Sequence, residues 1–184
     1  MNKSIRHFIA LPTFLILSSA TAIFSPTLSE LPVVAVPVAQ TRSRSYQPLP
    51  AAICNKMEQE MSNVLKVKVT MTQAAFQDAV SQEQRTGCQL TATGNGRNFT
   101  KLSDVVRKLS AMLTKQGWVE ASKYAADSPT GAARGFQKGN SLAWFNVEWE
   151  PSTDAKCPEN QPISECQLSP EQQLYRITLK AARK

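Results

Sequence analysis

The sequence predicts an α+β domain in which an antiparallel sheet of about five strands packs against two helices and is stapled by disulfides. Residues 102–116 carry an apolar stripe at helical spacing, and residues 142–150 and 174–181 alternate with the period of a strand. The expected order is helix, two strands, helix, then three or four strands, which does not alternate as a parallel βαβ fold would. Four cysteines in a chain of 184 residues can form two such disulfides.

The first 22 residues have the three-part order of a secretory signal peptide. Lys3 and Arg6 precede an apolar run over residues 8–17, and an Ala-Thr-Ala site then predicts cleavage before Ile23. A retained anchor is the alternative, although residues 8–24 fall short of the roughly 20 apolar residues that a membrane span needs. We therefore expect an exported protein, periplasmic or extracellular, with no transmembrane segment after cleavage.

Residues 23–49 are predicted to be a proline-rich linker. Five prolines lie between residues 23 and 50, and each of them fixes φ and removes an amide donor. An extended tether is expected there, followed by a single α+β domain over residues 50–184.

Charge and histidine content restrict the chemistry of the mature chain. Signal cleavage removes Lys3, Arg6 and the only histidine, His7, and leaves 19 basic against 14 acidic residues. A domain without imidazole cannot assemble a Ser-His-Asp or Cys-His arrangement or a histidine zinc site, so we expect no cofactor and no metal. The basic residues are spread thinly, which argues against a nucleic-acid partner and is compatible with weak attraction to anionic envelope polymers.

Two helices and two strands are expected in the first half of the domain. Residues 51–64 form an amphipathic helix, residues 66–72 alternate as a half-buried strand, and residues 88–92 form a strand that ends at a Gly-Asn-Gly turn. Residues 74–85 could extend either strand or form a helical turn. In the second helix Leu109 lies mid-stripe, and Gly117 has the place of a left-handed cap that folds Trp118 back onto Leu113.

The second half is expected to be a meander of strands near residues 118–124, 133–137, 142–150 and 174–181, with a tight turn at residues 138–140. Alternation along the last two strands predicts an inward face of Phe145, Val147, Trp149, Tyr175, Ile177 and Leu179. It predicts an outward face of Trp144, Asn146, Glu148, Glu150, Arg176, Thr178 and Lys180. If these strands pair, the two glutamates can face Arg176 and Lys180.

The four cysteines, Cys54, Cys88, Cys157 and Cys166, are expected to form two disulfides, because an exported domain folds under oxidising conditions. Three connectivities exist, and we favour Cys54 with Cys88 and Cys157 with Cys166. On the chain-entropy model the two loops contribute roughly 3.8 and 2.7 kcal/mol. A four-thiolate zinc site is the alternative, but it would normally show paired C-x-x-C motifs.

Two regions are candidates for ligand binding. Trp144 is a large aromatic on the outward face beside Asn146 and Glu148, where it could stack on a sugar ring or anchor a protein. The loop over residues 127–134 is rich in small residues and is bounded by Asp127 and Arg134. Loops of this kind often carry binding residues.

The function expected from these features is a non-enzymatic binding or envelope-associated module, whose partner is an envelope polymer or another exported protein. The alternative is a small glycan hydrolase that uses Glu148 and Glu150. These carboxylates lie two residues apart on one strand face, about 7 Å at the rise of a strand, a spacing that could suit an acid/base pair.

Three stretches carry a resemblance to known sequences: residues 115–118, residues 126–131, and residues 157–171, which contain the last two cysteines. In these stretches the chain resembles uncharacterised exported bacterial proteins of a cyanobacterial type. The resemblance covers most of the domain after Pro50. It implies export and no particular activity.

Overall fold

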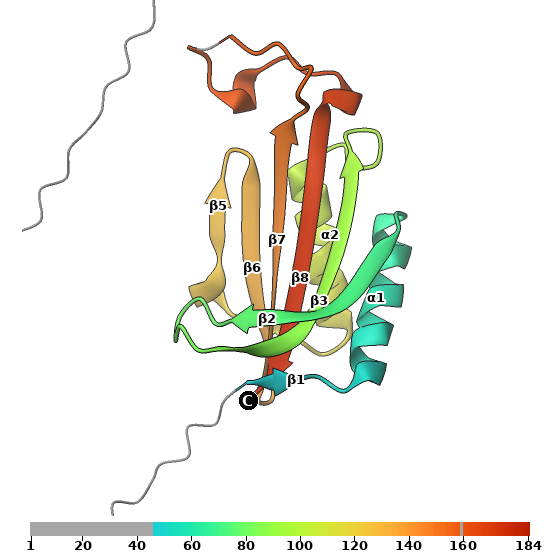
Figure 1. The fold of residues 1–184 in the computed structure, drawn as a ribbon, viewed down its shortest axis with the longest axis vertical. Helices are drawn as coiled ribbons and strands as arrows, with labels where there is room; N and C mark the ends of the chain where they lie inside the picture. Colours follow the sequence, from blue (N-terminus) through green and yellow to red (C-terminus); the bar gives the residue numbers. More distant parts are fainter. Residues whose placement is uncertain (1–45, 159) are drawn as a thin grey trace, which may run out of the picture. The chain divides into compact units, whose positions relative to one another are not determined.

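The computed structural model of the protein describes residues 46–184 except residue 159, and it contains two α-helices and an eight-stranded antiparallel sheet (Figure 1). The helices are α1 (Ala51–Leu65) and α2 (Leu102–Lys115). The strands are β1 (Gln47–Pro48), β2 (Val69–Gln77), β3 (Gln84–Asn95), β4 (Val119–Glu120), β5 (Ala126–Ser128), β6 (Gly131–Lys138), β7 (Ser141–Pro151) and β8 (Gln173–Arg183). The α+β class is therefore confirmed. The predicted signal peptide and nearly all of the linker lie outside the described residues.

The expected number of about five strands is wrong, because the sheet also contains short strands without a usable pattern. β1 and β5 are only two and three residues long, so they cannot show the alternation that identifies a strand. The strand expected over residues 118–124 ends at Glu120 and is followed by a 3-10 turn, Ser122–Tyr124. Residues 74–85 extend both neighbouring strands, β2 to Gln77 and β3 back to Gln84.

The fold begins slightly before the predicted boundary at residue 50. β1 pairs with the end of β8, and Tyr46 and Leu49 are buried, so residues 46–49 belong to the domain rather than to the linker. Pro48 suggested a linker, but proline is tolerated in a short peripheral strand that forms few ladder hydrogen bonds. A strand of two residues is too short for a sequence pattern to predict it.

The last strand of the chain lies in the middle of the sheet. The strand order is β2-β3-β8-β7-β6-β4, with β1 beside β8 and β5 beside β6. β8 therefore pairs with β3 on one side and with β7 on the other, each over eight or more register positions. This central place explains why Tyr175, Ile177 and Leu179 are all buried.

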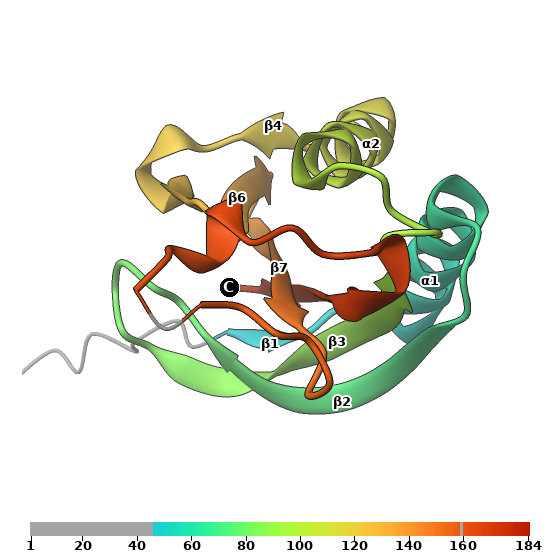
Figure 2. The ribbon, with the colours of Figure 1, turned by 90° about the horizontal axis from the view of Figure 1, so that it is seen from above.

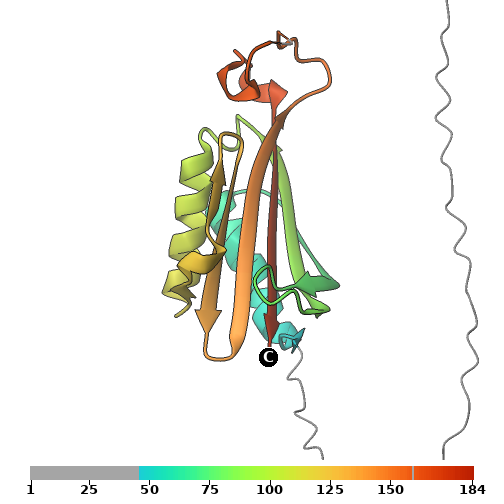
Figure 3. The same cartoon turned by 90° about the vertical axis from the view of Figure 1, so that its left-hand side faces the viewer.

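Both helices pack on one face of the sheet, as Figures 2 and 3 show. The α2 stripe is confirmed, since Val105, Leu109, Met112 and Leu113 are buried. Its predicted cap is confirmed as well: Gly117 has a φ of +82°, and the buried Trp118 donates its backbone N–H to the Leu113 oxygen at 3.1 Å. Phe145 and Val147 of β7 meet this layer from the sheet.

A second, smaller apolar cluster lies on the opposite side of the sheet. It consists of Tyr46, Phe76, Leu142 and Ala182, with Tyr124 and Trp144 partly buried against it. The start of the outward face of β7 is therefore only partly exposed to solvent, with Leu142 buried and Trp144 partly buried. Lys180 lies opposite Trp144 rather than a glutamate, and its Nζ is 5.6 Å from the indole centroid. The predicted pairing of Glu148 with Arg176 is confirmed in the register.

The two favoured disulfides are both present. Cys54 of α1 bonds to Cys88 of β3 with a Cα–Cα distance of 6.2 Å, and both residues are buried. Cys157 bonds to Cys166 in the loop between β7 and β8, with a Cα–Cα distance of 5.6 Å. Within residues 46–184, residue 159 aside, no helix is long and apolar enough to cross a bilayer.

Candidate functional site

Two adjoining cavities lie at the end of the sheet where the chain leaves β7 and returns into β8. One, of about 300 Å³, lies beside β7 and the β5–β6 turn, and the other, of about 340 Å³, lies over the ends of β3 and β8. They share Glu150, Leu174 and Arg176. We call the combined depression the transverse groove, because it crosses several strands.

The groove exists because neighbouring strands of the sheet end at different register positions. β6 begins at Gly131, which pairs with Glu148, so residues 149–151 of β7 have no partner from β6. Only the backbone N–H of Trp149 continues the contact, donating to the Thr130 oxygen at 2.9 Å. On the other side β3 ends at Asn95, opposite Leu174 of β8. The side chains beyond these ends have room for a ligand.

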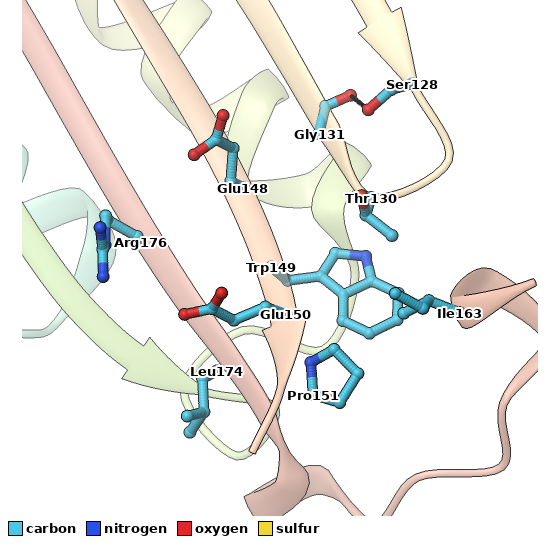
Figure 4. Close-up of a pocket in the computed structure, with 10 residues that line it drawn as sticks. All are labelled: Ser128, Thr130, Gly131, Glu148, Trp149, Glu150, Pro151, Ile163, Leu174 and Arg176. Carbon is cyan, nitrogen blue, oxygen red and sulfur yellow. Dashed lines mark hydrogen bonds between the residues drawn. The ribbon is translucent and has the colours of Figure 1, made fainter. Parts of the chain in front are cut away.

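Three charged side chains line the groove. Glu148 and Glu150 project from β7 on the side of Arg176, as Figure 4 shows, and all three residues are exposed. Glu148 and Arg176 are register partners, which puts their Cβ atoms about 4.5–5.5 Å apart. Among the described residues, none of the three has an oppositely charged group within 4.0 Å. Their hydrogen-bonding groups are therefore open to a ligand.

The apolar part of the groove is centred on Trp149. Its indole turns away from the two glutamates and lies next to Ile163 of the disulfide loop in Figure 4. Ile163 is 48% exposed and Leu174 is 40% exposed, although both are large apolar residues. A wall of this kind beside charged groups is typical of a pocket that binds a ligand with both apolar and polar surfaces.

Glu148 and Glu150 are the predicted candidate residues that the structure brings together in the groove. Trp144 and Asn146 lie on the same strand but do not line it. Trp144 packs against the second apolar cluster under Lys180, and its Nε1 is buried without a hydrogen-bond partner in the described part of the chain. The aromatic in the groove is Trp149. Its alternation predicted that it faces the core, and it does pack against the main core cluster while also lining the groove.

The predicted loop over residues 127–134 is a β-hairpin instead, because β5 and β6 pair directly across a turn at Pro129 and Thr130. Arg134 forms ion pairs with Asp127 at 2.9 Å and with Glu120 at 3.6 Å. Its side chain is 20% exposed and holds β4 and β5 against β6. Asp127 and Arg134 thus have partners within the fold.

A third cavity, of about 280 Å³, lies beside the second apolar cluster at the other end of the sheet. Asp78 is 3% exposed there and accepts hydrogen bonds from the Tyr46 hydroxyl at 2.7 Å and the Val80 N–H at 2.9 Å. Burial opposes ionisation of this carboxyl, but the hydrogen bonds from Tyr46, Val80 and Ser81 lower the pKa of Asp78 to about 2. Burial and the Asp78 carboxylate raise the pKa of Tyr46, and they raise the pKa of Tyr124 to about 12.

Asp78 was not selected from the sequence, since a single aspartate between two strand patterns carries no signal of burial. Its carboxylate is satisfied by groups of the fold itself, and it holds the chain before β1 onto the β2–β3 hairpin. We assign this cluster a structural role.

No family model, curated protein or solved structure matches this chain.

Proposed function

We propose that this protein is an exported binding module that holds a segment of an envelope polysaccharide in the transverse groove. Export is supported by the N-terminal pattern and by two disulfides, which persist in oxidising compartments. The observation that carries the proposal is the combination of Trp149 with three exposed charged residues, Glu148, Glu150 and Arg176, that have no ionic partner in the described part of the chain.

A sugar ring matches this combination better than a purely apolar or purely charged ligand. Its apolar face can pack on an indole, while its hydroxyl groups can donate to carboxylates and accept from a guanidinium. The second cavity adds Thr93, Asn95 and Asn98, which provide further hydrogen-bonding side chains. The two adjoining cavities leave room for more than one sugar of a polymer.

Co-sedimentation with purified peptidoglycan, followed by titration with its soluble fragments, tests the proposal. Arg176→Ala and Trp149→Phe should each weaken binding about tenfold or more, because central aromatic and arginine contacts carry most of a binding free energy. Lys108→Ala on the exposed side of α2 is the matched control and should bind as the wild type does. Wild-type affinity in both groove variants, with circular dichroism unchanged, would contradict the proposal.

Hydrolysis by Glu148 and Glu150 is the second candidate, because the structure brings both carboxylates into the same cavity. A general acid that works near neutral pH needs an apolar, water-poor surrounding, whereas both glutamates are exposed. The same fragments decide between the two functions. Release of new reducing ends by the wild type, but not by Glu148→Gln or Glu150→Gln, would establish an enzyme.

A further inference from the structure

The two disulfides lie in different surroundings. Cys54 and Cys88 are 3% and 2% exposed and join α1 to β3 inside the main core. Cys157 and Cys166 are half-buried, and no described residue of the ring that they close is buried. The second disulfide therefore protects no part of the hydrophobic core.

The ring is the tip of a loop whose base is fixed by other contacts. The Ser152 N–H donates to the Gln172 oxygen at 2.8 Å, and the Gly96 N–H donates to the Pro170 oxygen at 2.6 Å. Arg97 also forms an ion pair with Glu171. These contacts hold the two legs of the loop at the ends of β7, β8 and β3 without help from the disulfide.

The tip reaches the transverse groove through Ile163. This residue begins the short 3-10 turn Ile163–Glu165, and its side chain lies next to the Trp149 indole (Figure 4). Backbone bonds within the ring shape this turn, from Gln161 N–H to the Pro158 oxygen and from Cys166 N–H to the Ile163 oxygen, both at 3.1 Å. Closure by the disulfide limits the positions that Ile163 can take.

We propose that the ring closed by Cys157 and Cys166 is the affinity-determining wall of the transverse groove, with Ile163 as its contact residue. This inference rests on the proposed function, because it assumes that the groove is the binding site. The disulfide serves ligand binding by preorganising the wall, since a mobile wall would lose conformational entropy whenever a ligand ordered it. The buried disulfide serves the stability of the domain.

The first experiment needs no ligand. In a Trp144→Phe background, acrylamide quenching of the remaining tryptophans reports mainly on Trp149, because Trp118 is only 3% exposed. The double variant Cys157→Ser with Cys166→Ser should at least double the quenching constant, because Ile163 is then no longer held next to the indole. Its urea unfolding midpoint should fall less than that of Cys54→Ser with Cys88→Ser. Unchanged quenching, or a larger loss of stability than in the core variant, would overturn the inference.

The second experiment uses soluble peptidoglycan fragments. Ile163→Ala and the Cys157/Cys166 double variant should each bind about tenfold more weakly than the wild type, whereas Glu165→Ala, in the same ring but outside the groove, should bind normally. Undiminished binding by the first two would refute the role of the ring. If the wild type itself does not bind, the proposed polysaccharide function fails, and the quenching result still decides whether the disulfide holds the wall over Trp149.

Discussion

At the scale of single residues, burial separates Asp78 from the charged residues of the groove. Asp78 is almost fully buried, and its carboxylate accepts hydrogen bonds from Tyr46, Val80 and Ser81. Glu148, Glu150 and Arg176 are exposed and lack ionic partners among the described residues. A buried charge with a full set of hydrogen bonds contributes to folding, while exposed and unpaired charges are free to meet a ligand.

Asp78 should make the stability of the domain sensitive to acid. Its pKa falls from an ordinary value of 3.8 to about 2 on folding, so the unfolded chain binds the proton more tightly. Acidification from pH 5 to pH 2 should therefore lower the free energy of unfolding by about 2 kcal/mol through this residue, with full stability retained above pH 5. Urea unfolding of the wild type and of Asp78→Asn across this range measures the difference.

Asp78→Asn should reduce the free energy of unfolding by about 1–3 kcal/mol at pH 7. It should also lack the loss of stability between pH 5 and pH 2 that comes from the Asp78 carboxyl. Tyr46→Phe removes one of the hydrogen bonds that lower the pKa, so its acid-dependent loss should be smaller than in the wild type. Parallel pH profiles for all three proteins would show that the Asp78 carboxylate does not have the predicted environment.

At the scale of elements, α2 organises the main core. Its buried residues face the sheet, and its exposed side carries Arg107 and Lys108. Leu109 is fully buried at the centre of the stripe, whereas its neighbour Lys108 is exposed. Adjacent positions on one helix thus differ completely in their contact with the core.

Leu109→Ala should reduce the free energy of unfolding by about 2–5 kcal/mol, because it removes buried methyl groups and leaves a cavity. Lys108→Ala should change it by less than about 0.5 kcal/mol. Equilibrium urea unfolding of both variants at neutral pH is the measurement. Similar small losses for the two would mean that α2 does not pack on the sheet in this orientation.

β7 is the element that links the core to the groove. Its middle pairs with both β6 and β8, and Phe145 and Val147 are fully buried there. Its last residues extend past the start of β6 and therefore expose the Trp149 indole through an open edge. Trp149 therefore lines the candidate site because β7 extends beyond β6, and not because of the sequence of β7 alone.

At the scale of the whole molecule, one sheet separates two apolar clusters of unequal size. The larger lies under α1 and α2, and the smaller contains Tyr46, Phe76, Leu142 and Ala182. The candidate groove lies at the end of the sheet near the Cys157–Cys166 loop, away from the smaller cluster. The exposed Glu148, Glu150 and Arg176 can therefore change with little effect on either cluster, whereas Trp149 also packs against the larger one.

The domain should contain no free thiol. Thiol titration of denatured, unreduced protein should find none, and reduction should release the four cysteines of the two disulfides. Peptide mapping should recover Cys54 with Cys88 and Cys157 with Cys166. A different connectivity, or stoichiometric zinc bound to free thiolates, would contradict the structure of this domain.

The sequence by itself determined the two helices, the Gly117 cap and the inward faces of β7 and β8, and it favoured one of three cysteine connectivities without deciding between them. The helices, cap and faces follow from local patterns, because a helix or strand with one buried face repeats apolar residues at a fixed period. Only the tertiary structure decided the short strands β1 and β5, the cysteine connectivity, the burial of Asp78, the partial burial of Trp144 and the entry of Trp149 into the groove. These features depend on where strands that are distant in the sequence begin and end beside one another. The local periodicity of apolar residues contains no information about this.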